Sequence, residues 1–223
     1  MKNKNKTILV TASAKRLGKV IATDLVKFGW SVAIHYNKSK QLAEETANDL
    51  TKIGGNVTLF QADLTKNSDV EKLIYNLENS NSIWTGLINN AGYFNYDSGT
   101  NFDTKNLNDH MSVNFMAPTI LTKALANFTL KMKKEGKNKQ GFVINILDAK
   151  IFGLNPDYYS DTLSKQAMYG LTKMSALSYS ACLRVNGIAP GITLSAPGQD
   201  EKQFKKSHKN NLLKSSSTTE EIL

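Results

Sequence analysis

The chain is poor in the residues that build disulfide frameworks and metal sites. Cys182 is its single cysteine, which excludes a disulfide framework and a cysteine-based zinc site. Its three histidines, His35, His110 and His208, are scattered without the spacing of metal ligands. We therefore expect no bound metal.

Long apolar runs are absent as well. No run approaches the roughly 20 residues that cross a bilayer, so no membrane span is expected. A basic start, Met1–Lys6, precedes an apolar stretch that is too short for a signal peptide, and no small-residue cleavage site follows it. The sequence accordingly predicts a cytoplasmic protein.

Arginine is the third scarce residue. Only Arg16 and Arg184 occur, and the net charge of +9 comes mainly from lysines spread along the chain. Proteins that bind nucleic acids usually gather such charge in a patch or a stripe. The charge fits a phosphate-bearing small ligand better, so we expect no nucleic-acid partner.

Short β-branched runs alternate with longer amphipathic stretches along most of the 223 residues. The predicted strands are Thr7–Ala12, Ser31–Tyr36, Asn56–Gln61, Gly86–Asn89, Phe142–Leu147 and Val185–Ala189. The predicted helices are Leu17–Gly29, Lys38–Ile53, Ser68–Asn79, Asn106–Lys133 and Asp161–Ala181. This alternation predicts an α/β fold with a single doubly wound parallel sheet, a Rossmann-like three-layer sandwich. We expect one domain over residues 1–223, with an irregular polar tail at 195–223.

The segment Thr11-Ala-Ser-Ala-Lys-Arg-Leu-Gly18 joins the first predicted strand to the first helix. Free N–H groups at a helix N-terminus bind phosphate, which makes this segment a candidate site for a nucleotide. Its candidate binding residues are Thr11, Ser13, Arg16 and Leu17. Because the segment is poor in glycine, an ordinary strand–helix turn is the alternative.

The segment His35-Tyr-Asn-Lys-Ser39 ends the second predicted strand. Sites for NAD usually have an acidic residue here that holds the ribose 2′-hydroxyl, and this segment has none. Lys38 and Ser39, together with Arg16, suit a 2′-phosphate and so predict NADP(H). A solvated basic loop is the alternative. Asp63, after the third strand, is a candidate contact to adenine or else a helix cap.

The strongest motif is Asn89-Asn-Ala-Gly92, which follows the fourth predicted strand. Together with the opening Thr11–Gly18, it resembles the short-chain dehydrogenase/reductase family. Within that family the chain is most similar to pteridine reductases, through Lys15-Arg-Leu-Gly18, His35-Tyr36 with Lys38-Ser39, and Asp148. The resemblance covers residues 7 to about 200. It implies an NAD(P)-binding Rossmann domain that uses NADPH to transfer hydride to a pterin, a folate or a small carbonyl compound.

The resemblance also implies roles for individual residues. By position, Asn114 matches the active-site asparagine, Asp148 the catalytic serine slot and Lys165 the lysine that binds the nicotinamide ribose. Phe94 falls where pteridine reductases stack an aromatic ring on the pterin, although a core aromatic is the alternative. The implied cofactor contacts are His35, Tyr36, Asn90, Ala91, Gly92, Pro190 and Gly191.

Asp161 departs from the family pattern. It lies 13 residues after Asp148 and four before Lys165, where the resemblance implies a catalytic tyrosine. An aspartate beside a lysine is expected to stay ionised and to pair with it, and loss of a general acid costs roughly 10²–10⁴ in rate. Alternatively, Asp148 and Asp161 share a proton, which raises the pKa of one of them.

Two more departures concern Ala12 and the end of the chain. Ala12 stands where most relatives have a glycine, so a positive φ there would strain the loop by about 1 kcal/mol. The last helix and seventh strand of the family are missing, which leaves the sixth strand as an edge. A tetramer is therefore not expected, and a dimer through the fourth and fifth helices is the oligomer the sequence allows. These departures leave open an alternative function, that of a catalytically inactive NADP-binding remnant.

Overall fold

The computed structural model describes residues 5–194, 202, 204, 217–219, 221 and 222. Within this part of the chain, six parallel strands form one sheet in the order β3-β2-β1-β4-β5-β6. The strands are β1 (Lys6–Val10), β2 (Ser31–Tyr36), β3 (Val57–Gln61), β4 (Ile83–Asn89), β5 (Gly141–Ile146) and β6 (Leu183–Ile188). The predicted doubly wound parallel sheet is confirmed.

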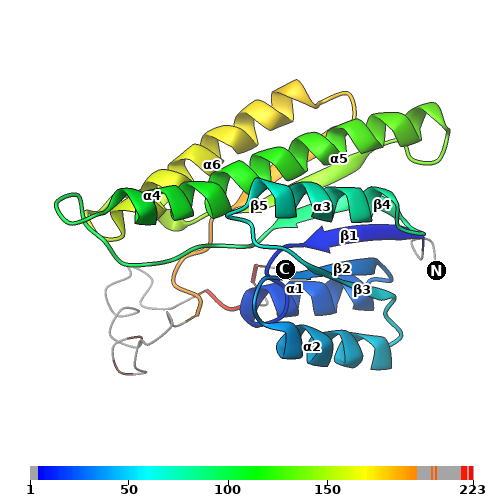
Figure 1. Ribbon diagram of the computed structural model, residues 1–223, viewed down its shortest axis with the longest axis horizontal. Helices are drawn as coiled ribbons and strands as arrows, with labels where there is room; N and C mark the ends of the chain where they lie inside the picture. The colour runs from blue at the N-terminus through cyan, green and yellow to red at the C-terminus, as the bar shows by residue number, and fades with distance from the viewer. Residues whose placement is uncertain (1–4, 195–201, 203, 205–216, 220, 223) are drawn as a thin grey trace.

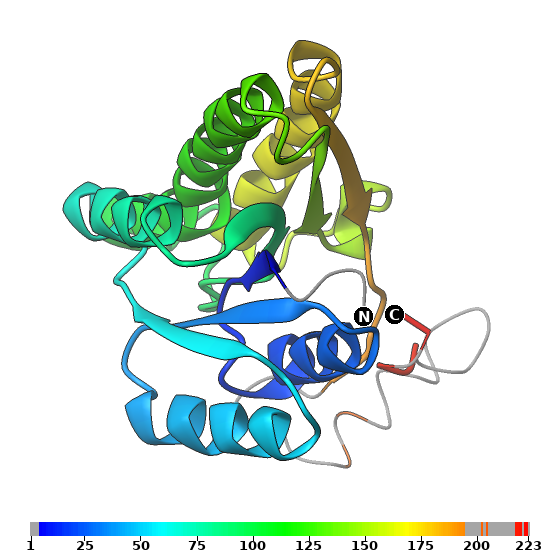
Figure 2. The same cartoon turned by 90° about the vertical axis from the view of Figure 1, so that its right-hand side faces the viewer.

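Helices cover both faces of the sheet, as Figure 1 shows. Two of them, α1 (Arg16–Lys27) and α2 (Lys40–Lys52), pack on one face beside β1, β2 and β3. The other face carries α3 (Asn67–Glu78), α4 (Thr104–Met111), α5 (Ala117–Lys134) and α6 (Tyr159–Ser178). Figure 2 shows the three layers from the side.

The arrangement places one crevice at the carboxyl ends of β1 and β4. Val10, the last residue of β1, pairs with Ile34 of β2 on one side and with Ile88 of β4 on the other. The chain leaves β1 toward one face of the sheet and leaves β4 toward the opposite face, so the connections diverge there. Ligands of open α/β sheets bind at such a switch point.

Two apolar clusters fill the space between the layers. One contains Leu87, Leu121 and Trp84 and lies beneath α3 and α5. The other contains Ile8, Ile21 and Ile34 and lies beneath α1 and α2. The alternating runs of the sequence therefore supply buried faces on both sides of the sheet.

The region 104–134 differs from its predicted form. The sequence pattern predicts one helix over Asn106–Lys133, whereas the structure divides it into α4, a π-helical turn η1 (Ser112–Met116) and α5. Single π-helical turns insert an extra residue and are frequent at functional sites. The apolar spacing continues through the turn, which is why periodicity alone did not reveal it.

The ends of the sheet and of the chain complete the description. In the described part of the chain, β6 lies at one edge and pairs only with β5. Most of the polar tail predicted for 195–223 lies outside the described residues. No helix among them is long and apolar enough to span a membrane. They also contain no group of three or more His, Cys, Asp or Glu residues arranged to hold a metal ion.

Candidate active site

Thr11 joins the carboxyl ends of β1 and β4. Its Oγ1 accepts hydrogen bonds from the backbone N–H of Asn90 at 2.9 Å and of Ala91 at 2.8 Å. The Asn90 Nδ2 donates in return to the Thr11 carbonyl at 2.9 Å. The structure thus brings together three predicted cofactor residues from distant parts of the sequence. Their mutual bonds give them a structural role in fixing the crevice.

The loop between β1 and α1 packs tightly against the start of its helix. A Cβ at Gly18 would lie 2.4 Å from the Ala12 carbonyl oxygen and 2.8 Å from the Ser13 Cα. The buried Ser13 donates its hydroxyl proton to the Val10 carbonyl at 2.7 Å, and Leu17 packs on the core beneath α1. Only glycine fits at position 18 of this loop.

Ala12 adopts a left-handed conformation with φ of 52°, so the condition under which alanine strains this loop is met. Its N–H donates to His35 Nδ1 at 3.0 Å, and His35 Nε2 donates to the Ala62 carbonyl at 3.1 Å. Burial lowers the pKa of His35 to about 4, so the ring is neutral at physiological pH. His35 therefore supports the loop and supplies no positive charge to a phosphate.

A hollow of about 440 Å³ opens at the crevice. Six residues of the predicted nucleotide motifs line it: Ala12, His35, Lys38, Asp63, Ala91 and Gly92. Asn37, which also lines it, belongs to the predicted segment His35–Ser39 but was not singled out. Sequence reasoning missed the other residues of the lining, which are Leu64, Thr65, Tyr93, Lys105, Asp109 and Val113. Three of these lie in α4 and η1, where no motif marked them.

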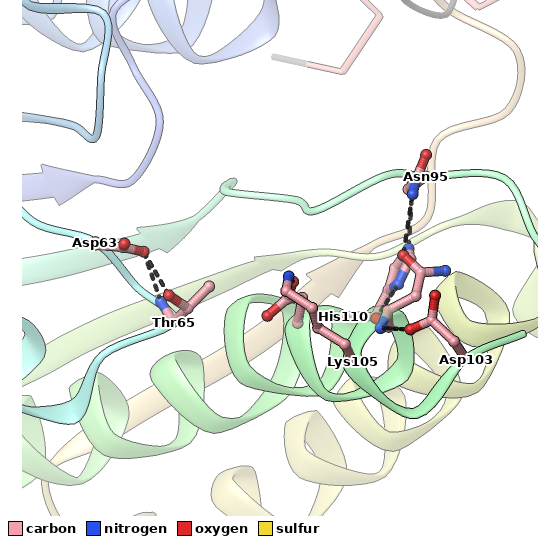
Figure 3. A network of polar contacts seen from close by, with 8 residues as sticks. Asp63, Thr65, Asn95, Asp103, Lys105 and His110 are labelled. Atoms are coloured by element: carbon pink, nitrogen blue, oxygen red, sulfur yellow. Dashed lines mark hydrogen bonds and ion pairs between the residues drawn. The ribbon is translucent and has the colours of Figure 1, made fainter.

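Asp63 and Thr65 form one wall of this hollow, and Figure 3 shows them beside Lys105 of α4. Asp63 Oδ1 accepts from the backbone N–H of Thr65 at 3.1 Å and from its hydroxyl at 2.7 Å. Burial acts to raise the pKa of Asp63, but the bonds from Thr65 and the nearby Lys66 outweigh it and lower the pKa. The carboxylate is therefore ionised, and its bonds to Thr65 stabilise a local turn. The N-cap of α3 is Lys66, so the alternative of a helix cap is wrong.

Three predicted residues lie away from the hollow. Arg16 lines a separate hollow beside α1, together with Lys19 and Thr219. Tyr36 packs on the core beneath α2, and Ser39 precedes α2, where its carbonyl accepts from the Ala43 N–H at 3.0 Å. Of the three residues expected to suit a 2′-phosphate, the structure brings only Lys38 to the crevice.

Asn114 lies at the centre of the predicted catalytic residues and is fully buried in the π-helical turn. Its Oδ1 accepts from the Tyr93 N–H at 2.7 Å. Its Nδ2 lies 3.1 Å from Asp161 Oδ1 and 2.9 Å from Ser164 Oγ. The side-chain amide thus connects the segment that follows β4 to the first turns of α6.

Asp161 and Lys165 are both buried but are not paired with each other. Lys165 Nζ donates to the Ile146 carbonyl at 2.8 Å, and no ion pair of the described residues joins it to Asp161. The expected pairing is therefore wrong. Burial raises the pKa of Asp161, and neighbouring Asp148 adds to that effect against the opposing charge of Lys165. An aspartate kept ionised by Lys165 would have a lowered pKa, and this expectation is wrong because burial outweighs the charge of Lys165.

Burial also lowers the pKa of Lys165. Each of the two side chains is thus biased toward its neutral form, which is the state in which a carboxyl group can give a proton and an amine can take one.

Asp148 and Pro190 bring the ends of β5 and β6 to the same place. The Ala149 N–H donates to the Pro190 carbonyl at 3.0 Å. Asp148 Oδ1 accepts from the Lys150 N–H at 2.7 Å and so caps a short 3₁₀ turn, η2 (Ala149–Ile151). Pro190 and Gly191 therefore lie next to Asp148, at the carboxyl edge of the sheet that also holds the crevice.

Phe94 is 44% exposed, so the alternative of a core aromatic is wrong. Its ring stacks on that of Tyr158, with centroids 4.4 Å apart and planes at 16°. The predicted contact of Phe94 with a substrate stays a prediction.

Comparisons with known proteins agree with this geometry. A family model described as short chain dehydrogenase matches residues 6–206. The 2-(S)-hydroxypropyl-CoM dehydrogenase 3 of Xanthobacter autotrophicus is 30% identical over 88% of this chain and 75% of its own. Pteridine reductase 1 of Leishmania tarentolae is 28% identical over 83% of this chain and 76% of its own.

A solved structure is similar over nearly the whole chain. The FolM alternative dihydrofolate reductase 1 of Brucella canis, complexed with NADP, is 33% identical with a TM-score of 0.90. The match covers 98% of this chain and 84% of that one. The sheet order, the crevice and these matches together show that the chain belongs to the short-chain dehydrogenase family.

Proposed function

We propose that this chain is an NADP(H)-dependent oxidoreductase that transfers hydride to a pterin, a folate or a small carbonyl compound. The observation that carries the proposal is the meeting of Asn114, Asp161 and Lys165 at the sheet edge that also bears the nucleotide crevice. Similarity to the Brucella FolM reductase and to the Leishmania pteridine reductase supports the choice of substrate class.

The crevice fits a phosphorylated dinucleotide. Gly18 lets the backbone of the loop approach the start of α1 closely, and a helix start of this kind binds phosphate through its free N–H groups. Lys38 lines the hollow after β2, where a carboxylate would select NAD. The neighbouring Lys105 adds a second cation to the lining. This charge pattern favours NADP over NAD.

The chain's own residues would handle the proton. NADPH supplies the hydride when it is bound. Asp161, whose pKa is raised by burial, gives a proton to the reduced oxygen or nitrogen of the substrate. An aspartate is shorter than a tyrosine by a whole ring, so this transfer runs through a water molecule. Asn114 orients the Asp161 carboxyl, and Lys165 binds the ribose beside it.

A second function, NADP binding without turnover, is favoured by one observation. Asp161 stands four residues before Lys165, where the family resemblance implies a tyrosine, and its shorter side chain weakens direct proton transfer. The two functions share the cofactor crevice and differ in the rate of hydride transfer.

Titration with NADPH and with NADH, read by fluorescence and by thermal shift, tests the cofactor part of the proposal. We expect selective binding of NADPH, and we expect Lys38→Glu to reverse or abolish the selectivity. Turnover of dihydrobiopterin or dihydrofolate then separates the reductase from the inactive binder. Failure of both cofactors to bind or to stabilise the wild-type chain would reject both functions.

A further inference from the structure

Three aromatic rings and a lysine form a cluster beside the catalytic residues, which we call the ring cluster: Phe94, Tyr96, Tyr158 and Lys150. The Phe94 and Tyr158 rings are stacked with centroids 4.4 Å apart. Tyr96 meets Tyr158 edge-on at 5.1 Å, and Lys150 Nζ lies 4.8 Å from the Tyr158 centroid. For a third ring to fit between Phe94 and Tyr158, the two rings would have to lie about twice the usual contact distance of 3.5–4.0 Å apart. The face of Phe94 that Tyr158 covers is therefore closed.

Phe94 is held in place by its two neighbours in the chain. Both backbone polar groups of Tyr93 bond to the Asn114 side chain, at 2.7 and 3.1 Å. The Asn95 N–H donates to Nε2 of the buried His110 at 3.3 Å, and Figure 3 shows this contact. Asn114 also contacts Asp161. Phe94 is thus a fixed platform. It directly follows Tyr93, whose backbone bonds to Asn114, and Asn114 in turn contacts the Asp161 carboxyl.

Tyr158 is held much more weakly. It adopts a left-handed conformation with φ of 55°, which costs a non-glycine residue roughly 1–2 kcal/mol. In the described part of the chain its hydroxyl makes no hydrogen bond, so stacking and the nearby Lys150 are what hold the ring. The segment before it, 152–157, is exposed. The segment after it is anchored, because the Ser160 N–H donates to Asp97 Oδ1 at 2.9 Å. Tyr158 therefore lies between an exposed segment and an anchored helix start, with only ring contacts on its side chain.

We propose that Tyr158 is a gate that covers the Phe94 platform, and that the ligand which displaces it is a planar conjugated ring with an anionic or acceptor group. This inference rests on the proposed function, because it assigns the substrate ring to Phe94. A left-handed residue of this kind persists only where surrounding contacts impose it, and such strain gathers at ligand clamps and switches. The Tyr158 carbonyl accepts from the Thr162 N–H at 2.9 Å, so its backbone stays in place while the ring swings away, and the incoming ring recovers the stacking energy.

Lys150 defines the chemistry of that ligand. Its Nζ lies over the Tyr158 ring and donates to the Asp157 carbonyl at 3.1 Å. Its charge also acts to lower the pKa of the Asp161 carboxyl, so this member of the ring cluster lies near the catalytic residues. A ring in the position of Tyr158 therefore meets a cation, and a saturated, uncharged ring gains nothing from it.

The test is a set of equilibrium titrations of the full-length chain with dihydrobiopterin, a planar probe, in the presence and absence of NADP⁺. Tyr158→Gly removes both the ring and the strain, because glycine accepts a positive φ freely. We expect its dissociation constant for the probe to fall by about three- to tenfold, since the stacking energy of two such rings favours the closed site over the open one by about that factor. Phe94→Leu should abolish probe binding, and Lys150→Gln should weaken it.

A matched control is available in Tyr169, which also has a lysine over its ring, with Lys173 Nζ 4.7 Å from the centroid. Tyr169→Leu should leave probe affinity unchanged. Equal or weaker probe binding by Tyr158→Gly would overturn the gate, and so would absence of probe binding by every variant. The NADP⁺ titration of the same samples is read separately, so failure of the proposed function is distinguished from failure of the gate.

Discussion

The loop after β1 and the start of α6 both bury polar side chains, but they satisfy them differently. Thr11 and Ser13 of the loop, and His35 of the neighbouring β2, each form hydrogen bonds with nearby backbone groups. At the start of α6, the hydroxyls of Ser160 and Thr162 have no hydrogen-bond partner among the described residues. Lys165 has a single acceptor, the Ile146 carbonyl.

The difference fits the proposed roles of the loop in binding and of the α6 start in reaction. Buried polar groups with their bonds made fix one conformation, whereas under-bonded ones cost stability. Perturbed acids and bases of this kind gather at functional sites. The loop is thus built for a fixed fit, and the α6 start holds groups whose protonation can change.

The largest expected effect comes from a substitution that disrupts the loop after β1. Gly18→Ala places a methyl group 2.4 Å from a backbone oxygen, so we expect a loss of about 3 kcal/mol in unfolding free energy together with loss of NADPH binding. Denaturant unfolding and cofactor titration measure the two effects. As a control, Gly170→Ala in α6, where nothing lies near the new Cβ, should stabilise by about 1 kcal/mol. Unchanged NADPH affinity in Gly18→Ala would refute the tight-loop account.

The second effect is a loss of stability in acid that is specific to His35. The folded pKa of about 4 lies below the ordinary histidine value of 6.5, so this contribution is complete above pH 6.5 and is lost as the pH falls toward 4. The expected size is about 3 kcal/mol.

Unfolding curves of wild type and His35→Asn between pH 7 and 4 isolate this contribution, since all other titrating groups are shared. The difference in unfolding free energy should narrow as the pH falls. A constant difference across this range would show that His35 is not buried as a neutral ring.

The third effect concerns the α6 start. The folded pKa of Asp161 is raised above its unfolded value. The protonated carboxyl therefore contributes to the free energy of unfolding at acid pH, and this contribution is lost as the pH rises through the folded pKa. Asp161→Asn should therefore stabilise the chain at pH 7 by about 1 kcal/mol, the size typical of one under-bonded buried polar group. This gain should shrink in acid.

Thermal unfolding from pH 4 to 8 measures the trend, with the exposed Asp157→Asn as a control that should change little. A variant that is less stable than wild type at pH 7 would mean that the ionised carboxylate is well satisfied.

The smallest expected effect comes from a substitution that removes backbone strain in the loop after β1. Ala12→Gly removes the cost of a left-handed alanine, offset in part by the greater entropy of glycine in the unfolded chain. We expect a gain of at most about 1 kcal/mol and NADPH binding that is a few times tighter. Ala124→Gly, in the middle of α5, should have the opposite sign in the same unfolding assay. Loss of stability in Ala12→Gly would contradict the strain.

The sequence predicted the sheet because hydrophobic periodicity and turn residues depend only on neighbouring positions in the chain. Strands such as Ser31–Tyr36 were placed to the residue, and the motifs at the ends of β1 and β4 pointed to the crevice. The π-helical turn at Ser112–Met116 was not predicted, because its apolar spacing continues that of a helix. Lys105 and Asp109 were missed since a helix, rather than a strand end, carries them to the hollow.

The state of Asp161 depended on three-dimensional packing. From the sequence, Lys165 four residues away is the nearest charge and predicts an ionised pair. In the fold, the Lys165 ammonium turns to the Ile146 carbonyl and burial dominates the Asp161 carboxyl. Likewise, nothing in the spacing indicated that the Tyr158 ring would stack on Phe94.

The most direct test of the account combines NADPH affinity with dihydropterin reduction for wild type and Asp161→Tyr. We predict that both proteins bind NADPH equally, and that the variant turns over about 10²–10⁴ times faster because its acid reaches the substrate directly. Equal affinity with that gain would show an intact binding half beside an altered reacting half. Absence of NADPH binding in wild type, or no gain in the variant, would contradict the account.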